Sequence, residues 1–307
     1  MRPFRKKVAL AIDGGGFKGI MVAKALAILE EYLGKSCHDI FKMAVGTSTG
    51  SIISTAIGTG MNASQIYELY SNFGKEIFRK TCRYYLWPLT RYKYSNKALI
   101  KVLKDSFGEI TMGDFWKSGS KFDLVITVRD LVENRSLFVK PWKKEYQKWK
   151  AFFAVLASCS VPTYFPVVEG RYIDGGVGSY SNPCYIAAYE AINCLNWEPE
   201  ETTLISIGTG RVKKRIEPYT ASHYFAWQWI SPILDTFLSD TSDQQVRIVR
   251  QFFRKLDFRR FQIDIEPVAM DDPSEIKLLT EYGEKLGRMI LKDKTDTFSI
   301  RPAGFAK

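Results

Sequence analysis

The sequence lacks the features that define several large classes of proteins. Its five cysteines include no C-x-x-C pair, so neither a disulfide framework nor a zinc site is expected. No run of about 18 apolar residues is present, so no transmembrane helix is predicted. The apolar run at 8–12 ends at Asp13 and is too short for a signal peptide. These absences predict a cytoplasmic protein with reduced thiols and no metal site.

Histidine is also scarce, because the 307 residues include only His38 and His223. His38 lies in a polar stretch and is expected to be solvated. His223 lies in the aromatic segment 221–230, which is typical of the start of a buried helix, so we interpret it as a packed or partly exposed residue. A hydrolase that uses histidine as its base would have to use one of these two.

Acidic residues are too few to balance the basic ones. Asp and Glu number 33 against 44 for Lys and Arg, which gives a net charge of +11. Such an excess favours anionic partners, namely phospholipid headgroups, nucleotides or nucleic acid, without choosing among them. No known nucleic-acid-reading motif is present, so nucleic acid is the least favoured of the three.

What the sequence does contain is an alternation of short apolar runs and helical patterns, which is typical of βαβ units. A helix is predicted at 19–34, and the tail from 222 onward is mostly helical in pattern. Residues 74–118 mix basic and aromatic side chains without strand periodicity, which predicts an insertion or cap. One continuous α/β domain is therefore expected, with strands at 8–12, 41–46, 122–130, 135–140, 202–208 and 259–267.

A G-x-S-x-G pattern follows the predicted strand 41–46, at Gly46, Ser48 and Gly50. This spacing is typical of a nucleophile elbow, in which a serine is presented on a sharp strand-to-helix turn. A serine hydroxyl attacks a carbonyl only when a base takes its proton. The pattern therefore predicts a nucleophile and raises the question of its base.

Three adjacent glycines follow the first predicted strand, at Gly14, Gly15 and Gly16. With Gly19 they match G-x-G-x-x-G, which allows a Rossmann-type dinucleotide-binding protein. That fingerprint expects an acidic residue about 20 positions on, where this chain has Gly34. The alternative is an oxyanion hole, because glycine backbone N–H groups at a helix N-terminus bind negative charge.

An Asp-Gly-Gly sequence at Asp174, Gly175 and Gly176 follows a short apolar stretch. Taken alone, it is an ordinary turn. At the same sheet edge as Ser48, however, its carboxylate could accept the serine proton directly. A Ser-Asp dyad would explain why no histidine is placed for that role.

Together these motifs make the chain resemble the patatin-like phospholipases. The matching stretches occur in the family's order: DGGGFKG (13–19), AVGTSTGS (44–51), ASCSVPTYFP (157–166), DGGVGSYSNP (174–183) and LISIGTG (204–210). The resemblance implies a three-layer α/β/α sandwich with a mostly parallel sheet. It also implies a catalytic core at 8–210 with the cap-like insertion at 74–118, and a helical extension at 211–307 packed on the same domain.

The resemblance also implies roles for individual residues. Ser48 would be the nucleophile and Asp174 its base. Gly14, Gly15 and Gly16 would supply oxyanion-hole amides, assisted by Lys18 where the family usually has arginine, although lysine lacks the guanidinium fork. The activity implied is hydrolysis of carboxylic esters in phospholipids or galactolipids, with membrane glycerophospholipids as the expected substrate and without calcium or another cofactor. The glycines that shape the turns would be Gly19, Gly46, Gly50, Gly175 and Gly176.

A narrower resemblance is to the patatin-like effectors of bacterial cyclic-oligonucleotide anti-phage signalling. It implies a cyclic dinucleotide activator, self-assembly into a homo-oligomer and degradation of the membrane in defence. The segment 79–104 carries eight basic residues among aromatic ones, which suits an anionic bilayer surface or a nucleotide. The equally open alternative is a solvated basic face over core aromatics. The expectation is peripheral association with the inner face of the membrane.

Overall fold

A mostly parallel sheet of seven strands forms the centre of the computed structural model, which describes residues 1–117, 121–212 and 219–297. Six strands follow the order β4-β3-β2-β1-β6-β8, and β5 pairs with β3. β4 and β5 run antiparallel to β3, and the other pairs are parallel. The bounds are β1 Lys7–Ile12, β2 Met43–Gly46, β3 Asp123–Asp130, β4 Arg135–Val139, β5 Tyr172–Asp174, β6 Thr202–Ile207 and β8 Asp257–Phe261.

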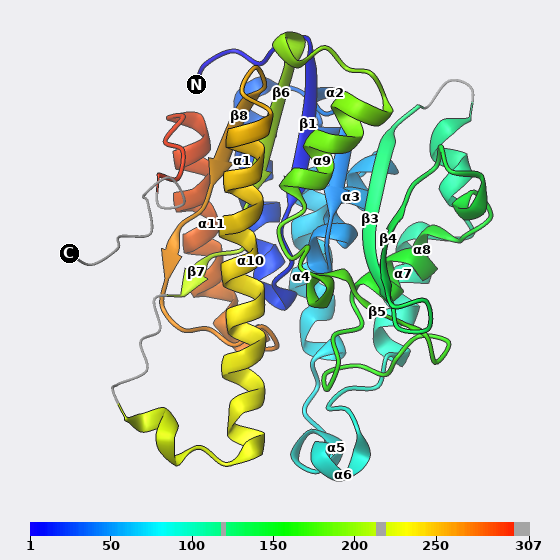
Figure 1. Ribbon diagram of the computed structural model, residues 1–307, viewed down its shortest axis with the longest axis vertical. Helices are drawn as coiled ribbons and strands as arrows, with labels where there is room; N and C mark the ends of the chain where they lie inside the picture. Colours follow the sequence, from blue (N-terminus) through cyan, green and yellow to red (C-terminus); the bar gives the residue numbers. More distant parts are fainter. Residues whose placement is uncertain (118–120, 213–218, 298–307) are drawn as a thin grey trace.

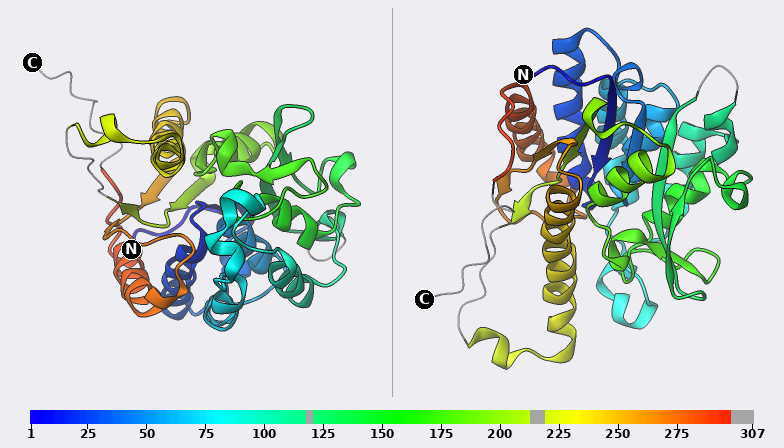
Figure 2. Two further views of the ribbon diagram at one scale, coloured as in Figure 1. Left: turned by 90° about the horizontal axis from the view of Figure 1, so that it is seen from below. Right: turned by 45° about the horizontal axis from the view of Figure 1, so that its top comes forward.

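Helices cover both faces of this sheet, as Figures 1 and 2 show. One face carries α1 (Gly19–Leu33), α3 (Thr49–Gly58), α4 (Ala63–Ile77), α7 (Lys97–Phe107), α8 (Ala151–Ser158) and α11 (Ile276–Leu291). The other carries α9 (Cys184–Tyr189) and α10 (Ile230–Phe252). The short helices are α2 (Cys37–Ile40), α5 (Cys82–Tyr85) and α6 (Trp87–Thr90). The expected three-layer α/β/α fold with a mostly parallel sheet is confirmed.

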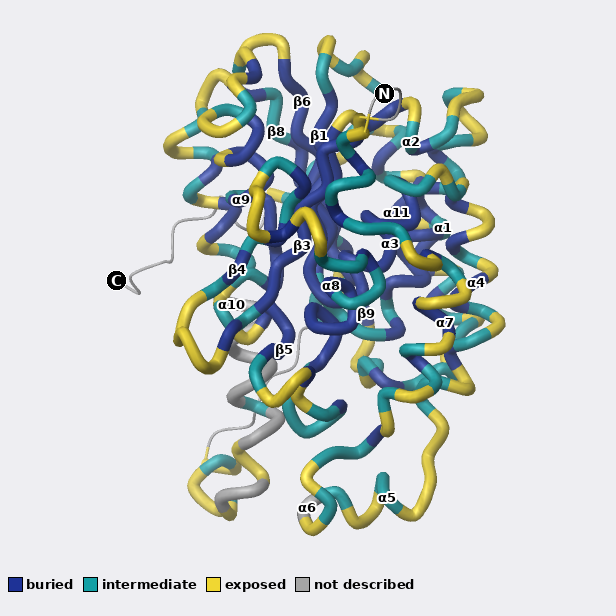
Figure 3. Tube along the Cα trace, turned by 90° about the vertical axis from the view of Figure 1, so that its right-hand side faces the viewer, coloured by how far each residue is buried: buried dark blue, intermediate teal, exposed yellow. Residues whose placement is uncertain are grey.

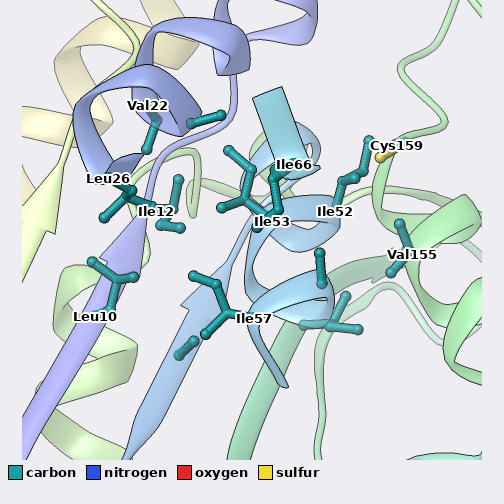
Figure 4. Packing of buried hydrophobic residues seen from close by; sticks show 14 of the residues in the cluster. Leu10, Ile12, Val22, Leu26, Ile52, Ile53, Ile57, Ile66, Val155 and Cys159 are labelled. Carbon is teal, nitrogen blue, oxygen red and sulfur yellow. The ribbon is translucent and has the colours of Figure 1, made fainter. Parts of the chain in front are cut away.

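The two cores on either side of the sheet follow from the alternation of side chains along each strand. In β1, Leu10 and Ile12 face the larger core beneath α1 and α3, while Ala9 and Ala11 face α9 and α10. Figure 4 shows the larger core, and Figure 3 shows that the strands are buried along the centre of the molecule. The central strands are therefore apolar on both faces, as parallel strands usually are.

The predicted strands are confirmed, but the last of them changes the picture of the C-terminal part. The stretch 259–267 contains β8 and then β9 (Asp264–Ile265), which pairs with β7 (Arg211–Val212). β8 pairs in parallel with β6, so the region expected as a helical extension supplies an edge strand of the central sheet. Residues 213–218 and 298–307 of that region lie outside the described residues, as does residue 118 of the expected cap.

The packed alternative for His223, the start of a buried helix at 221–230 and the solvated state of His38 were wrong. His223 is exposed on a one-turn helix, η7 (Thr220–His223), and the long helix begins only at Ile230. His38 is half-buried rather than solvated, because its ring stacks on Phe122 and its Nδ1 lies 2.9 Å from the carbonyl oxygen of Ile57.

Within the described part of the chain, none of the helices is both long and apolar enough to cross a membrane.

Candidate active site

Ser48 stands on a sharp turn between β2 and α3. Its φ of 53° lies in the left-handed region that side chains other than glycine rarely adopt. The two flanking glycines are required by close approach. A Cβ on Gly46 would lie 2.1 Å from the carbonyl oxygen of Gly50, and one on Gly50 would lie 2.2 Å from that of Ile12. The local geometry is that of a nucleophile elbow.

Asp174 reaches the same place from the last residue of β5. The sheet register explains why, since β2 and β5 pair with the same edge of β3, Gly46 at Ile126 and Asp174 two residues further on at Val128, while β4 pairs with the opposite edge. The Asp174 side chain is buried, and its Oδ1 accepts a 2.7 Å hydrogen bond from the Gly176 amide. Its Oδ2 makes no hydrogen bond of normal geometry within the described ranges, although the Ser48 hydroxyl lies close enough to lower the Asp174 pKa.

Asp174 favours its protonated, uncharged form more than an exposed aspartate does. Burial raises its pKa to about 7, because a carboxylate is poorly stabilised away from water. The nearby Ser48 hydroxyl and the Gly176 amide oppose this effect only in part. A carboxyl group whose pKa lies near the working pH can accept a proton and later return it.

The segment 157–160 holds both residues through two serines. The Ser48 amide donates a 2.9 Å hydrogen bond to Oγ of Ser158, the last residue of α8. The Asp174 amide donates a 3.1 Å hydrogen bond to the Ser160 carbonyl oxygen. These two contacts explain how the stretch 157–166 contributes to the site, which the sequence indicated only through the family resemblance.

The glycine loop after β1 lies against Ser48, since a Cβ on Gly14 would be 3.3 Å from the Ser48 Cβ. The structure differs from expectation at Gly14, whose amide donates a 2.8 Å hydrogen bond to the Ser181 carbonyl oxygen and cannot also bind an oxyanion. The amides of Gly15, Gly16 and Thr49 have no acceptor within the chain segments that the structure describes. These three N–H groups are the available donors.

Lys18 ends the one-turn helix η1 (Gly16–Lys18) and is half-buried. The chain at Gly15 is held so closely that a Cβ there would lie 2.3 Å from Oγ1 of Thr209. Thr209 in turn donates a 2.6 Å hydrogen bond to the Gly14 carbonyl oxygen. The glycines in this loop are therefore needed for packing as well as for their amides.

A buried ion pair anchors the same loop to β8. Arg260 donates to Asp13, with 2.7 Å between Nη1 and Oδ1, and its Nη1 also lies 2.8 Å from Oγ of Ser206. Further along the loop, the Phe17 amide donates a 2.7 Å hydrogen bond to the Met270 carbonyl oxygen. The sequence analysis missed Arg260, and no local signal marks it, because it lies 247 residues after Asp13.

A narrow apolar cavity of about 60 Å³ leads from Ser48 into the space between α4 and α7. It is close to the size of a few water molecules. Its wall at Ser48 includes Gly16, Thr49 and Cys159. Its deeper lining is almost entirely hydrocarbon and includes Phe17, Ile52, Leu69, Phe78, Val102 and Leu103.

The two histidines lie apart from this arrangement. His38 is engaged by Ile57 and Phe122, and His223 is exposed on η7. In the part of the chain that is described, neither makes a contact with Ser48 or Asp174. No group of three or more His, Cys, Asp or Glu side chains is placed to hold a metal ion within the same residues.

Comparisons with known proteins point to one family. A family model described as patatin-like phospholipase matches residues 10–188. Patatin-01 of Solanum tuberosum is 25% identical over 351 aligned residues, which cover 97% of this chain and 88% of that protein. Patatin group D-2 of the same species is 26% identical over 360, with the same two shares.

Solved structures provide more distant likenesses. VipD from Legionella pneumophila is matched with a TM-score of 0.49 and 14% identity, over 94% of this chain and 67% of that one. The type III effector protein ExoU is matched with a TM-score of 0.43 and 11% identity, over 96% of this chain and 54% of that one.

Proposed function

The chain belongs to the patatin-like phospholipase family and is a lipid-acyl hydrolase of the esterase type, and from this premise we propose that it cleaves membrane glycerophospholipids through a Ser48–Asp174 dyad. The observation that carries the proposal is the buried Asp174 carboxyl group beside a serine on a glycine-defined elbow. The distance of both histidines from this pair supports a base other than histidine.

The proposed reaction has two halves. Asp174 takes the proton of Ser48 as the serine Oγ bonds to the ester carbonyl carbon, and the carbonyl oxygen becomes an oxyanion. The amides of Gly15, Gly16 and Thr49 are the donors placed to stabilise that charge. When the ester C–O bond breaks, Asp174 returns the proton to the departing alcohol, which leaves an acyl-serine.

Water completes the cycle. Asp174 takes a proton from a water molecule as the water oxygen bonds to the acyl carbon. The second tetrahedral intermediate then collapses, the Ser48 oxygen leaves with that proton, and the fatty acid is released. One carboxyl group thus serves as base and acid in alternation, which a pKa near 7 suits in both directions.

The apolar cavity behind Ser48 supports an acyl chain as the group transferred. An ester placed with its carbonyl at the three amides has its acyl chain directed toward the hydrocarbon lining between α4 and α7. At about 60 Å³ the cavity is too small for a long chain, so α4 or α7 would have to shift outward when substrate enters.

A serine-reactive fluorophosphonate probe and a phospholipid hydrolysis assay test the dyad together. We expect labelling and hydrolysis in the natural protein and neither in Ser48→Ala. Asp174→Asn should lower turnover by about 10²–10⁴-fold, the usual contribution of a general base. His223→Ala is the matched control and should keep full probe labelling and full activity toward a dissolved ester. Loss of activity in a folded His223→Ala protein would contradict the dyad.

A finer proposal concerns location and control. We propose that the protein binds peripherally to the inner membrane face, that it self-assembles, and that a cyclic dinucleotide activates it in anti-phage defence. The narrower family resemblance and the basic segment 79–104 support this proposal. Lipid hydrolysis should be measured with a panel of cyclic di- and trinucleotides, alongside the oligomeric state. A rate unchanged by every member of the panel would dispose of the activator and leave the dyad untouched.

A further inference from the structure

Two tips project from the end of the molecule toward which the parallel strands point (Figures 1 and 3). The first tip, residues 79–93, contains α5 and α6. The second tip, residues 219–229, contains η7 and η8 (Ala226–Trp229) and leads into α10. Because Ser48 follows β2, the candidate site opens toward this same end.

Large apolar side chains are exposed on both tips. On the first tip Leu89 is 83% exposed and Leu86 50%. On the second, Tyr219 is 85% exposed and Phe225 63%. Clusters of exposed apolar groups of this kind mark surfaces that bind something.

The charge around the first tip indicates what that partner is. Residues 77–104 contain no Asp or Glu and eight Lys or Arg. Several of the cations lie over aromatic rings, with Lys80 Nζ 5.1 Å from the Tyr84 ring centre and Lys93 Nζ 4.0 Å from that of Tyr164. Basic heads beside aromatic and aliphatic side chains suit the headgroup level of an anionic bilayer. The same charge repels a second copy of this tip.

Each tip is tied to one part of the candidate site. Next to the first tip, Tyr94 packs on Phe78 in the cavity wall, with 5.5 Å between ring centres, and the Lys93 amide bonds to the Thr163 carbonyl oxygen at 2.8 Å. The second tip leads into α10, and further along this helix, towards its C-terminal end, Gln245 donates a 3.2 Å hydrogen bond to the Ser179 carbonyl oxygen in the segment after Asp174. A surface that fixes both tips therefore also fixes the orientation of the site.

We propose that the two tips together form the surface by which this protein docks on an anionic phospholipid bilayer. Leu86, Leu89, Tyr219 and Phe225 enter the interface, the basic residues of the first tip contact headgroup phosphates, and the cavity at Ser48 faces the lipid. This deepens the proposed function and rests on its assignment of a membrane phospholipid as substrate.

Vesicle sedimentation with the full-length Ser48→Ala protein tests docking without hydrolysis. We expect binding to vesicles of equal parts phosphatidylcholine and phosphatidylglycerol, and much weaker binding to phosphatidylcholine alone. Adding Leu86→Ser with Leu89→Ser, or Tyr219→Ser with Phe225→Ser, should weaken binding by roughly tenfold or more for each pair. The matched control is Phe252→Ser, because Phe252 is 72% exposed at the opposite end of α10 and should not matter.

The same tip substitutions with Ser48 intact separate docking from chemistry. Turnover of a short, fully dissolved ester should be unchanged, whereas hydrolysis of vesicle lipids should fall in parallel with binding. Unchanged vesicle binding in both tip variants would overturn the proposal, as would an equal loss in Phe252→Ser. Self-association that is lost in the tip variants, without vesicle binding, would assign the surface to a second copy instead. Vesicle binding without lipid hydrolysis in the natural protein, both with and without the cyclic nucleotide panel, would leave the docking surface standing and remove the proposed function.

Discussion

At the scale of single residues, Asp174 is placed where it favours chemistry and opposes folding. Burial raises its pKa to about 7, so the carboxylate that the proposed mechanism needs as its base is in balance with the neutral acid near neutral pH. Because of this burial, the ionised carboxylate is less stable in the folded protein than in the unfolded chain, where water solvates it. Activity and stability should therefore respond to pH in opposite directions.

The first consequence is a pH–rate profile. For a dissolved ester, kcat/KM should rise with pH through about 7 and level off above it, because only ionised Asp174 can act as the base. Initial rates measured from pH 5 to 9 at constant ionic strength would show this. A profile that is flat across that range contradicts Asp174 as the base.

The second consequence concerns stability. The folded-state pKa of Asp174 exceeds its unfolded value of about 3.9, so the folded state binds the proton more tightly. This contribution is present below the unfolded pKa and is lost as pH rises through about 7. Asp174→Asn should therefore unfold in urea with a free energy up to about 4 kcal/mol above that of the natural protein at pH 8. The difference should shrink toward pH 4, and a difference independent of pH would argue against this account.

At the scale of elements, β8 supplies the arginine that anchors the glycine loop. Neighbouring side chains of a strand point to opposite faces, so Arg259 and Arg260 have different tasks. Arg260 pairs with Asp13 at the start of the glycine loop. Arg259 is equally buried but bonds to Asp257 and to the carbonyl oxygens of Arg2 and Pro3.

Arg260→Met should lower the free energy of unfolding by about 3–5 kcal/mol, because it leaves the Asp13 carboxylate buried without its partner. Adding Asp13→Asn should recover part of that loss. Arg259→Met is the matched control, since it also breaks a buried ion pair but does not touch the loop. Under conditions where both proteins are folded, kcat should fall only in Arg260→Met. Equal kcat values in the two variants would show that the loop does not depend on Arg260.

The same elements show how far the sequence could lead. Ser48 and Asp174 could be placed together because both follow strands that end at one sheet edge, and glycine spacing marks each turn. The occupied amide of Gly14 could not be predicted, because its acceptor, Ser181, approaches through tertiary packing. Arg260 was hidden for a similar reason, since a pairing across 247 residues leaves no local pattern.

At the scale of the whole molecule, the sheet does not end where the motifs do. The family model matches residues 10–188 and the last motif ends at residue 210, but the edge strand β8 and the helix α11 come later. β8 pairs with β6 along its length, and α11 packs on α1. The apparent catalytic core is thus an incomplete fold.

A chain shortened to residues 1–210 should therefore fail to fold cooperatively. The shortened chain would expose the edge of β6 that pairs with β8 and the face of α1 that α11 covers. It would also leave Asp13 without Arg260 as its partner. Circular dichroism during thermal melting, with the full chain as the control, would show the loss of a cooperative transition. A sharp transition and fluorophosphonate labelling in the short chain would establish residues 1–210 as an independent domain.

The tie between Asp13 and Arg260 also has a consequence for biosynthesis. Ser48, Asp174 and the glycine loop leave the ribosome well before Arg260, because Arg260 lies 247 residues beyond its partner. Until β8 emerges, the glycine loop lacks its anchor, and the amides of Gly15 and Gly16 that are proposed as oxyanion donors are not fixed in place. On the proposed mechanism, a polypeptide whose Arg260 has not yet left the ribosome is therefore expected to be inactive as an acyl hydrolase.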